Sequence, residues 1–486
     1  MRRVLCMILG IIYLSGCTMI PKYKQPAAPV PNQWPSGVAY PAKEATSGSL
    51  EATQIKWQEF FTDPKLQKVI TMAIENSRDL RLAVLNTERA RALYGISIAD
   101  LLPIGNADAS GNQQKASMDF TAPGTSMTSK FYDVNLGIAA WEVDFFGRIR
   151  SLEKQALEDY LGTDEARRST QISLVSDVAR IYLTVASERA NLKLAKSTLE
   201  TQLGAYKLIE KRYKLKLTNE IDLRRVQTQV DTARGDVAQY TQRVAQAQNA
   251  LNFLTGIAVP EDLLPFDLAS VSSLKDVSSG LSSQVLLRRP DIMAAEHRLK
   301  GANANIGAAR AAFFPRISLT TTLGTASNEL SGLFTGGTST WFYGAQATMP
   351  IFDARTWFAY RVSKADREIA LTQYEKAIQT AFREVADVLA VRGTVNQQIA
   401  AQQSLVDSSK KIYDLSEKRY KLGIDDYLSV LDAQRSLYSA QRGLIFLQVT
   451  KLANEVRAYA VLGGGVDYPK ITKSSLMKKF FRIFRI

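Results

Sequence analysis

An internal duplication constrains the fold of this 486-residue chain more than any other feature of its sequence. The hexapeptide EKRYKL occurs at residues 210–215 and again at 417–422, an offset of 207 residues. A second matched pair surrounds Pro103 and Pro315 at an offset of 212, and loops between the anchors tolerate the difference in length. The sequence therefore predicts two structural repeats, each with the order helix, proline, β-hairpin and long helical hairpin. Their expected bounds are residues 57–258 and 259–468.

The helical hairpins, expected at about 153–256 and 360–463, are unusually long. Proline is absent from residues 151–259 and 351–468. A helix from about Glu153 to Lys216 would extend for about 96 Å, far more than a globular core needs. Apolar residues spaced by three, four or seven predict coiled-coil-like packing, although charged residues interrupt the series and leave an ordinary amphipathic helix as the alternative. The expected seam residues are Val178, Tyr182, Val185, Leu192, Leu199, Leu203, Tyr206 and Tyr213.

Two β-hairpins, at about 104–146 and 316–353, show the alternation typical of strands that contact lipid. Apolar side chains recur at every second position, and the predicted strands approach the nine to eleven residues or so that span a bilayer. The stretch 105–113 is the weakest, because its apolar face carries only small residues. A soluble hairpin is the alternative for any one strand taken alone. The alternating apolar series are Val134, Leu136, Ile138 and Ala140; Ile317, Leu319, Thr321 and Leu323; and Tyr343, Ala345, Ala347 and Met349.

Four strands cannot close a barrel by themselves. Open sheet edges in lipid leave backbone N–H and C=O groups without hydrogen-bond partners, which costs on the order of several kcal/mol for each group. The chain must therefore oligomerise, and this argument alone allows a dimer, a trimer or a tetramer. Tyr132, Trp141, Trp341 and Phe342 are candidates for the membrane interfaces.

The N-terminus reads as a targeting segment. Residues 1–16 are predicted to be a signal peptide, because Arg2 and Arg3 precede an apolar run that is too short to span a bilayer permanently. The run ends in the sequence LSGC, which resembles a bacterial lipobox, so Cys17 is predicted to be acylated and to become the mature N-terminus. An ordinary signal peptide with a chance cysteine is the alternative. Residues 17–56 are rich in proline and are expected to form an extended linker.

Composition excludes several classes of function. The formal net charge is +14, but much of it lies in the leader and in the basic C-terminal tail, residues 469–486, so we expect no nucleic-acid partner. The chain has two cysteines, Cys6 and Cys17, and one histidine, His297. A Cys/His metal centre and a catalytic triad are therefore not expected, and no cofactor is implied. His297 is expected to be an ordinary residue on a helix face.

Five motifs, in order, resemble the TolC-like outer-membrane efflux factors, in their NodT-type lipoprotein branch. The resemblance implies a mixed α and β membrane protein: a homotrimer with a 12-stranded barrel continued by a long coiled-coil helical barrel in the periplasm. It also implies outer-membrane lipid, a periplasmic membrane-fusion adaptor and an inner-membrane transporter of the resistance-nodulation-division type as partners. The motifs are WQEFFTDP at 57–64, WEVDFFG at 141–147, LRRPDI at 287–292, GAARAAFFP at 307–315 and YLSVLDAQ at 427–434.

The predicted function is that of a passive exit duct in a tripartite efflux pump, lipid-anchored in the outer membrane and extending into the periplasm. An exit duct for type I protein secretion is an alternative within transport. A coiled-coil lipoprotein that spaces the envelope would explain the helices but not the strands. Nothing in the sequence supplies the constellation of an enzyme.

Two groups of residues are the candidate functional sites. The turns of the helical hairpins form the periplasmic tip and are predicted to contact the adaptor, with plain solvated turns as the alternative; the residues are Leu217, Thr218, Asn219, Gly423, Ile424 and Asp425. By resemblance, Leu428 and Asp432 match the positions that narrow the periplasmic mouth. Arg435 shares their helix face, and Arg225 is the repeat equivalent of Asp432. A solvated Asp432 paired with Arg435 is the alternative to a gate.

Overall fold

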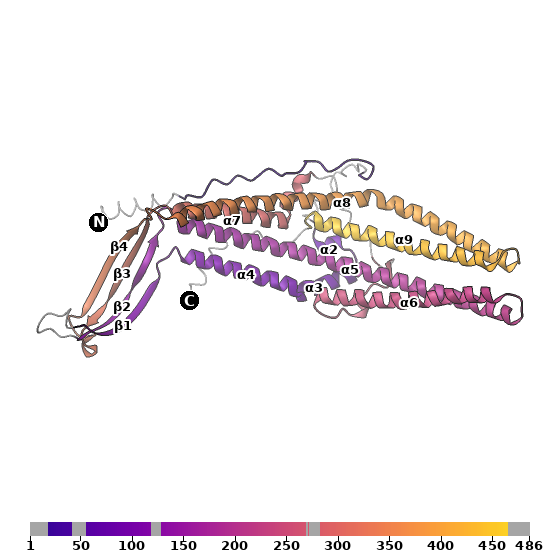
Figure 1. Cartoon of the computed structure of the whole chain (residues 1–486), viewed down its shortest axis with the longest axis horizontal. Coiled ribbons are helices and arrows are strands. Elements are labelled where there is room, and N and C mark those ends of the chain that lie inside the picture. The colour runs from indigo at the N-terminus through magenta and orange to yellow at the C-terminus, as the bar shows by residue number, and fades with distance from the viewer. Residues whose placement is uncertain (1–17, 41–54, 118–127, 269–270, 272–281, 465–486) are drawn as a thin grey trace.

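The computed structural model describes residues 18–40, 55–117, 128–268, 271 and 282–464. The molecule is elongated, with a β-sheet at one end and the turns of two helical hairpins at the other (Figure 1). The two repeats lie side by side, so that equivalent elements of the first and second halves point the same way.

The sheet contains four antiparallel strands in the order β1-β2-β3-β4. The second strand of the first hairpin therefore pairs with the first strand of the second hairpin, which joins the two repeats into one sheet. The weakly predicted first strand is present and is 11 residues long. The strands are β1 Gly105–Lys115, β2 Thr128–Val143, β3 Arg316–Ser327 and β4 Ser339–Thr348.

Four helices form the two long hairpins, α5 with α6 and α8 with α9. The helices α5 and α8 contain 67 and 68 residues, which corresponds to about 100 Å each at the rise of an α-helix. Both begin directly after a strand, and both end in a turn that starts the returning helix. The four are α5 Arg148–Lys214, α6 Glu220–Thr255, α8 Ala354–Lys421 and α9 Tyr427–Val461.

The expected apolar seam of α5 is correct only in its first half. Val178, Tyr182 and Val185 are fully buried. Nearer the tip, the predicted leucines and tyrosines are only partly buried or exposed, and the buried side chains are Ala195, Gln202 and Ile209, spaced by seven residues. A small residue and an amide at these positions allow close helix packing but do not stand out in a hydrophobic series.

Two further helices, α4 Arg78–Ala99 and α7 Pro290–Ala311, occupy equivalent places in the two repeats. The α7 helix packs against both α5 and α8. The α4 helix packs against α5 and leaves several leucines and an isoleucine exposed on its other side. Each helix ends just before the proline that precedes its β-hairpin, as expected from the repeat.

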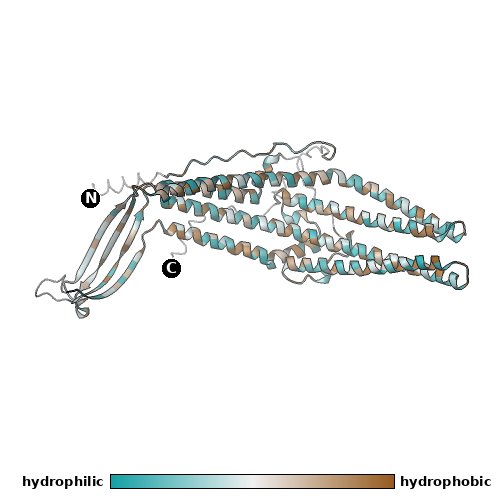
Figure 2. Cartoon of the chain, in the orientation of Figure 1, coloured by the Kyte–Doolittle hydropathy of each residue, from teal (hydrophilic) through white to brown (hydrophobic). Residues whose placement is uncertain are grey.

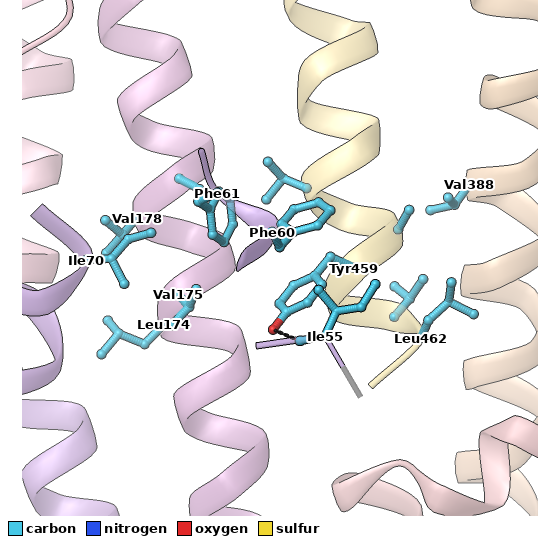
Figure 3. Packing of buried hydrophobic residues seen from close by; sticks show 14 of the residues in the cluster. Ile55, Phe60, Phe61, Ile70, Leu174, Val175, Val178, Val388, Tyr459 and Leu462 are labelled. Atoms are coloured by element: carbon cyan, nitrogen blue, oxygen red, sulfur yellow. Dashed lines mark hydrogen bonds between the residues drawn. The ribbon is translucent and has the colours of Figure 1, made fainter. Parts of the chain in front are cut away.

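The main hydrophobic core lies midway along the helices, where two short helices, α2 Trp57–Phe60 and α3 Pro64–Asn76, cover α5 and α9. Phe60 stacks on Tyr459 with ring centroids 4.4 Å apart, and the Tyr459 hydroxyl donates to the Ile55 carbonyl (Figure 3). These contacts join the start of the first repeat to the end of the second. Short 3-10 turns complete the fold at Glu261–Leu263, Ser283–Arg288 and Leu330–Gly332.

The N-terminal segment, residues 18–40, contains no helix and follows the surface of α7 and α8 (Figure 1). It is not a free linker. The side-chain amide of Asn303 donates to the Pro21 carbonyl at 2.8 Å, and Trp34 stacks on Phe382 with centroids 5.1 Å apart. A Cβ on Gly307 would lie 2.6 Å from Ile20, so this glycine permits the close approach of the segment to α7.

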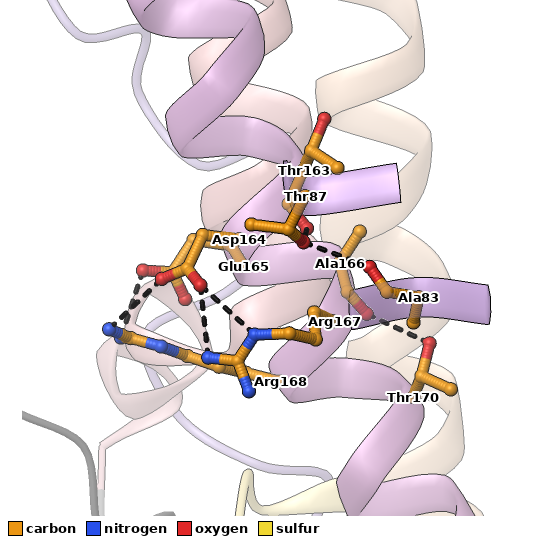
Figure 4. Close-up of polar contacts among 9 residues, drawn as sticks. All are labelled: Ala83, Thr87, Thr163, Asp164, Glu165, Ala166, Arg167, Arg168 and Thr170. Carbon is orange, nitrogen blue, oxygen red and sulfur yellow. Dashed lines mark hydrogen bonds and ion pairs between the residues drawn. The ribbon is translucent and has the colours of Figure 1, made fainter. Parts of the chain in front are cut away.

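A polar patch lies on α5, near its contact with α4 (Figure 4). Arg167 and Arg168 pair with Asp164 at 2.9 and 3.3 Å, and Arg168 also pairs with Glu165 at 3.0 Å. Burial raises the pKa of Glu165 above its usual range, and its second carboxylate oxygen is buried without a hydrogen-bond donor among the described residues. The patch is a set of intrahelical pairs, which holds charged residues on a largely buried helix.

Candidate functional site

The sheet has one apolar and one polar face. Leu136 lies opposite Leu323, which in turn lies opposite Trp341, so the three side chains form a row across one face, and all three are exposed. On the other face, Ser110 donates to Asp133 across the β1–β2 pair. Hydrophobic and hydrophilic residues accordingly alternate along the strands (Figure 2). An exposed apolar sheet face of this kind is suited to contact with lipid.

The alternation predicted for β2 is wrong at its C-terminal end, because the strand contains a β-bulge. Ile138 lies opposite Thr321 and Trp141 lies opposite Leu319, so two residues of β2 face a single residue of β3. Ala140, expected on the apolar face, instead adopts a φ of 50° and donates its backbone N–H to the Thr320 hydroxyl. The extra residue reverses the alternation, and Trp141 thereby joins the apolar face instead of the polar one.

The two tip turns have the same backbone structure. Lys216 and Gly423, which are 207 residues apart, both adopt left-handed conformations, with φ of 59° and 73°. In each turn the next N–H donates to a carbonyl five residues back, from Leu217 to Arg212 at 2.9 Å and from Ile424 to Arg419 at 3.0 Å. Both helices therefore end in a Schellman motif. The returning helices are capped by equivalent residues, Asn219 and Asp426.

Side chains distinguish the two turns. In the first turn, the Thr218 hydroxyl donates to Asp222 at 2.8 Å. Its repeat equivalent is Asp425, which accepts two hydrogen bonds from Arg419 at 2.6 and 2.9 Å. These bonds hold the pKa of Asp425 below its usual range. Large apolar residues are exposed at both tips, which is unusual for a solvated turn; they are Leu215, Leu217, Ile221, Leu422 and Ile424.

The candidate gate residues lie one to three turns from the tip. Asp432 and Arg435 are each 59% exposed and form an ion pair with one another on α9, the arrangement that was expected as the alternative to a gate. Leu428 is partly buried. Arg225 lies 3.8 Å from Asp222 on α6, so the equivalent position of the first repeat carries the opposite charge.

A small apolar cluster behind these residues joins the two hairpins near the tip, and the sequence analysis missed it. Tyr420 and Tyr427 stack edge to face across the second turn, and the guanidinium of Arg212 lies 5.4 Å from the centre of the Tyr420 ring. Burial raises the pKa of Tyr427. The only sequence signal was the pair of tyrosines that flank the turn. The cluster consists of Ile209, Val226, Tyr427, Val430 and Leu431.

The remaining predicted residues carry no chemistry that the structure reveals. Cys17 lies outside the described residues. His297 is on α7, as expected, but it has a partner: its Nδ1 lies 2.7 Å from a Glu158 oxygen, and Lys154 contacts the other oxygen at 2.6 Å. Within the described ranges, no group of three or more metal-ligating side chains occurs. Among these residues there is also no helix long and apolar enough to cross a membrane.

Comparison with known proteins decides the family. The chain matches the outer membrane efflux protein family over residues 69–257 and 281–464. The chain belongs to this family. It is 45% identical over 459 residues to the solvent efflux pump outer membrane protein SrpC of Pseudomonas putida, covering 94% of this chain and 97% of that protein. It is 39% identical over 406 residues to the outer membrane protein OprJ of Pseudomonas aeruginosa, covering 83% and 84%.

Solved structures agree. The fold is similar to that of a membrane protein from Pseudomonas aeruginosa, with a TM-score of 0.86 and 37% identity, and to the open state of the MtrE outer membrane channel of Neisseria gonorrhoeae, with a TM-score of 0.83 and 38% identity. Each match covers 92% of this chain and 98% of the other. This outer membrane efflux protein is therefore a channel component of an efflux pump, and it is a transport duct, not an enzyme.

Proposed function

We propose that three copies of this outer membrane efflux protein form a closed channel, with a 12-stranded barrel above a tunnel of helices. The outer edges of β1 and β4 have no partner strand within the described sheet. Pairing β4 of one copy with β1 of the next would satisfy both edges. The family resemblance selects three copies among the closed rings that strand pairing allows.

The contacts of the internal repeat support this ring. The α7 helix is packed between α5 of the first repeat and α8 of the second. Its counterpart α4 packs against α5 but leaves an apolar stripe exposed, formed by Leu82, Leu85, Leu93 and Ile96. The α8 helix carries a complementary exposed stripe of Phe358, Val362 and Ile369. Contact between α4 of one copy and α8 of the next would repeat the α7–α5 arrangement around the ring.

The exposed tips are the proposed contact with a periplasmic adaptor. Leu217 and Ile424 occupy equivalent places in the two turns and are exposed, so a ring of three copies presents six such apolar points. Burying them against an adaptor would remove apolar surface from water, which favours binding. The adaptor would in turn connect the channel to an inner-membrane transporter of the resistance-nodulation-division type. Solvents are the proposed cargo, because SrpC is named for solvent efflux.

The proposed gate is the ring that threefold symmetry makes from Leu428 and Asp432. A ring of leucines blocks water and ions by dewetting, and a ring of carboxylates favours cations. Three facing carboxylates repel one another, and the Asp432–Arg435 pair reduces that repulsion within each copy. Arg225, on the other hairpin, supplies further positive charge near the mouth.

Single-channel recording in planar bilayers tests this function. The Leu428→Ala/Asp432→Ala variant is expected to conduct more than the wild type and to prefer cations less. Asp231→Ala is the matched control, because Asp231 forms the same kind of intrahelical pair with Arg234, at 3.0 Å on α6. Wild-type conductance in the double variant would place the constriction elsewhere, and no conductance by any purified trimer would reject the channel itself.

Lipid anchoring at Cys17 is a separate proposal, supported by the lipobox-like sequence alone. Mass spectrometry of the intact protein is expected to show a mature chain that begins at Cys17 and carries acyl groups. An unmodified Cys17 or cleavage at another residue would contradict it.

A further inference from the structure

A cavity lies where the sheet joins the helices, between the end of α7 and the first turns of α8. Its volume is ≈ 330 Å³. The N-terminal segment forms one wall, held in place because the Met19 carbonyl accepts from Arg310 at 3.4 Å and Ile20 packs on Gly307. The wall is thus fixed before any ligand arrives. The cavity is lined by Met19, Arg310, Phe313, Phe314, Trp357 and Tyr360.

Two cations lie over the ring of Tyr360, which lines this cavity: Arg310, also a lining residue, and Lys364 from the next turn of α8. The Lys364 ammonium lies 4.4 Å from the centre of the Tyr360 ring, and the Arg310 guanidinium lies 5.9 Å from it. The nearby Arg310 and Lys364 lower the pKa of the Tyr360 hydroxyl. Neither cation forms an ion pair with a carboxylate of the described residues, whereas Arg355 and Arg367, on the same helix as Lys364, do. The cavity therefore has an uncompensated positive charge.

The surroundings of the cavity are apolar and lie at the junction between the sheet and the helices. Strands β3 and β4 meet α7 and α8 here, so the site is at the end of the lipid-facing sheet. A second cavity of ≈ 330 Å³ shares Phe313 and Trp357 with the first and continues past Ile351 and Phe352, which are 98% and 94% exposed. A cationic pocket beside an exposed apolar track has the two-part character of a phospholipid.

The geometry points to a binding site for an anionic phospholipid of the periplasmic leaflet, with its phosphate between Arg310 and Lys364 and its acyl chains along the track past Trp357. Two unpaired cations favour a lipid with net negative charge over a zwitterionic one. The aromatic side chains are suited to the interface because they combine an apolar ring with a polar edge. This site is distinct from the tip and the gate, and it does not depend on acylation of Cys17.

Native mass spectrometry of the full chain, released from nanodiscs with equal amounts of phosphatidylglycerol and phosphatidylethanolamine, tests the site. The wild type is expected to retain phosphatidylglycerol preferentially. Arg310→Gln/Lys364→Gln is expected to lose about 30-fold in phosphatidylglycerol affinity, because each cation near a membrane surface contributes about fivefold. Arg355→Gln/Arg367→Gln is the matched control, since it removes the same amount of charge, in this case from α8 alone, at residues that already have acidic partners.

Each alternative occupant predicts a different result. Equal loss of lipid in both double variants would show a diffuse surface effect and overturn the site. Competition by soluble glycerol 3-phosphate at the same concentration as lipid would identify a free phosphate ester as the ligand and overturn the lipid. Greater phosphatidylglycerol retention by a Cys17→Ser variant would show that the protein's own acyl chains fill the cavity, which also overturns it. The same spectra report the mass of the oligomer, so they distinguish a failure of the proposed trimer from a failure of the lipid site. If the double variant does not assemble, Lys364→Gln alone, at an exposed helix position, gives the same test with a smaller loss.

Discussion

The two tip turns allow an exchange experiment within one molecule. Lys216 and Gly423 occupy the same left-handed position of the same Schellman motif, yet only one of them is a glycine. Gly423→Lys makes the second turn resemble the first, and Lys216→Gly does the reverse. Because the backbone hydrogen bonds of the two turns match, each exchange tests mainly the conformational preference of the residue at this position.

The structure sets the expected size of the effect. A Cβ on Gly423 would meet nothing within 4 Å, so no steric clash contributes. An L-residue in the left-handed region costs about 1–2 kcal/mol. Glycine, however, loses more chain entropy on folding, which offsets about 0.5–1 kcal/mol of this difference. We therefore expect Gly423→Lys to destabilise its turn by about 1 kcal/mol, and Lys216→Gly to stabilise the other by about the same amount.

Hydrogen exchange with mass spectrometric detection measures these local changes. The amides of Leu217 and Ile424 close the two motifs and should exchange through opening of each turn. Exchange of Ile424 is expected to become about fivefold faster in Gly423→Lys, and exchange of Leu217 about fivefold slower in Lys216→Gly. The unaltered turn of each variant is the internal control. Changes of the same sign in both variants, or changes in the unaltered turn, would refute the conformational argument.

Two further predictions concern buried charges in the helical body. Arg289 is 8% exposed and donates hydrogen bonds to the Val461 carbonyl at 2.7 Å and to two carboxylates. Arg289→Met should therefore lower the free energy of unfolding by about 3–5 kcal/mol, measured by circular dichroism as a lower guanidinium midpoint. Arg288→Met, at the exposed neighbouring position, is the control, and equal midpoints for the two variants would contradict the buried role of Arg289. Burial tends to raise the pKa of Glu158, but the hydrogen bonds from His297 and Lys154 lower it by more, so the pKa of Glu158 is lowered in the folded protein. Its ionised form therefore contributes stability above the pKa of the unfolded chain, and this is lost as the pH falls through the folded value. Glu158→Gln should be less stable than the wild type near neutral pH, with the gap closing in acid, and a constant gap in unfolding midpoints would refute this linkage.

The sequence was sufficient to predict elements that rest on local patterns. The repeated hexapeptide places both tip turns correctly, because each copy ends at the residue before the turn begins. Period-two alternation places all four strands, including the weak first strand with its small side chains. Proline at residues 103 and 315 correctly separates the helices α4 and α7 from the strands that follow. Each of these signals lies within a few residues of the element that it specifies.

What the sequence could not predict depends on contacts between distant segments. The bulge at Ala140 arises where β2 pairs with β3, 180 residues away, and alternation within β2 alone gives no sign of it. The buried series of Ala195 and Gln202 reflects how closely α5 approaches its neighbours, not its own hydrophobicity. The tip cluster and the cavity beside Met19 likewise combine residues of several elements. Acylation, adaptor contact and gating remain predictions, since each involves a group or a partner outside this single chain.

The charge difference between the two hairpins has a consequence for a ring of three copies. The six tips would share one backbone geometry and so could pack in a nearly sixfold arrangement. At the level of the mouth, however, the second hairpin carries Asp432 where the first carries Arg225, and both are exposed or nearly so. Alternating positive and negative positions around the ring would lower the energy of a closed mouth relative to six like charges. The repeats thus keep one backbone geometry in their turns and differ in charge at this level, a combination that would favour a closable mouth on a duplicated scaffold.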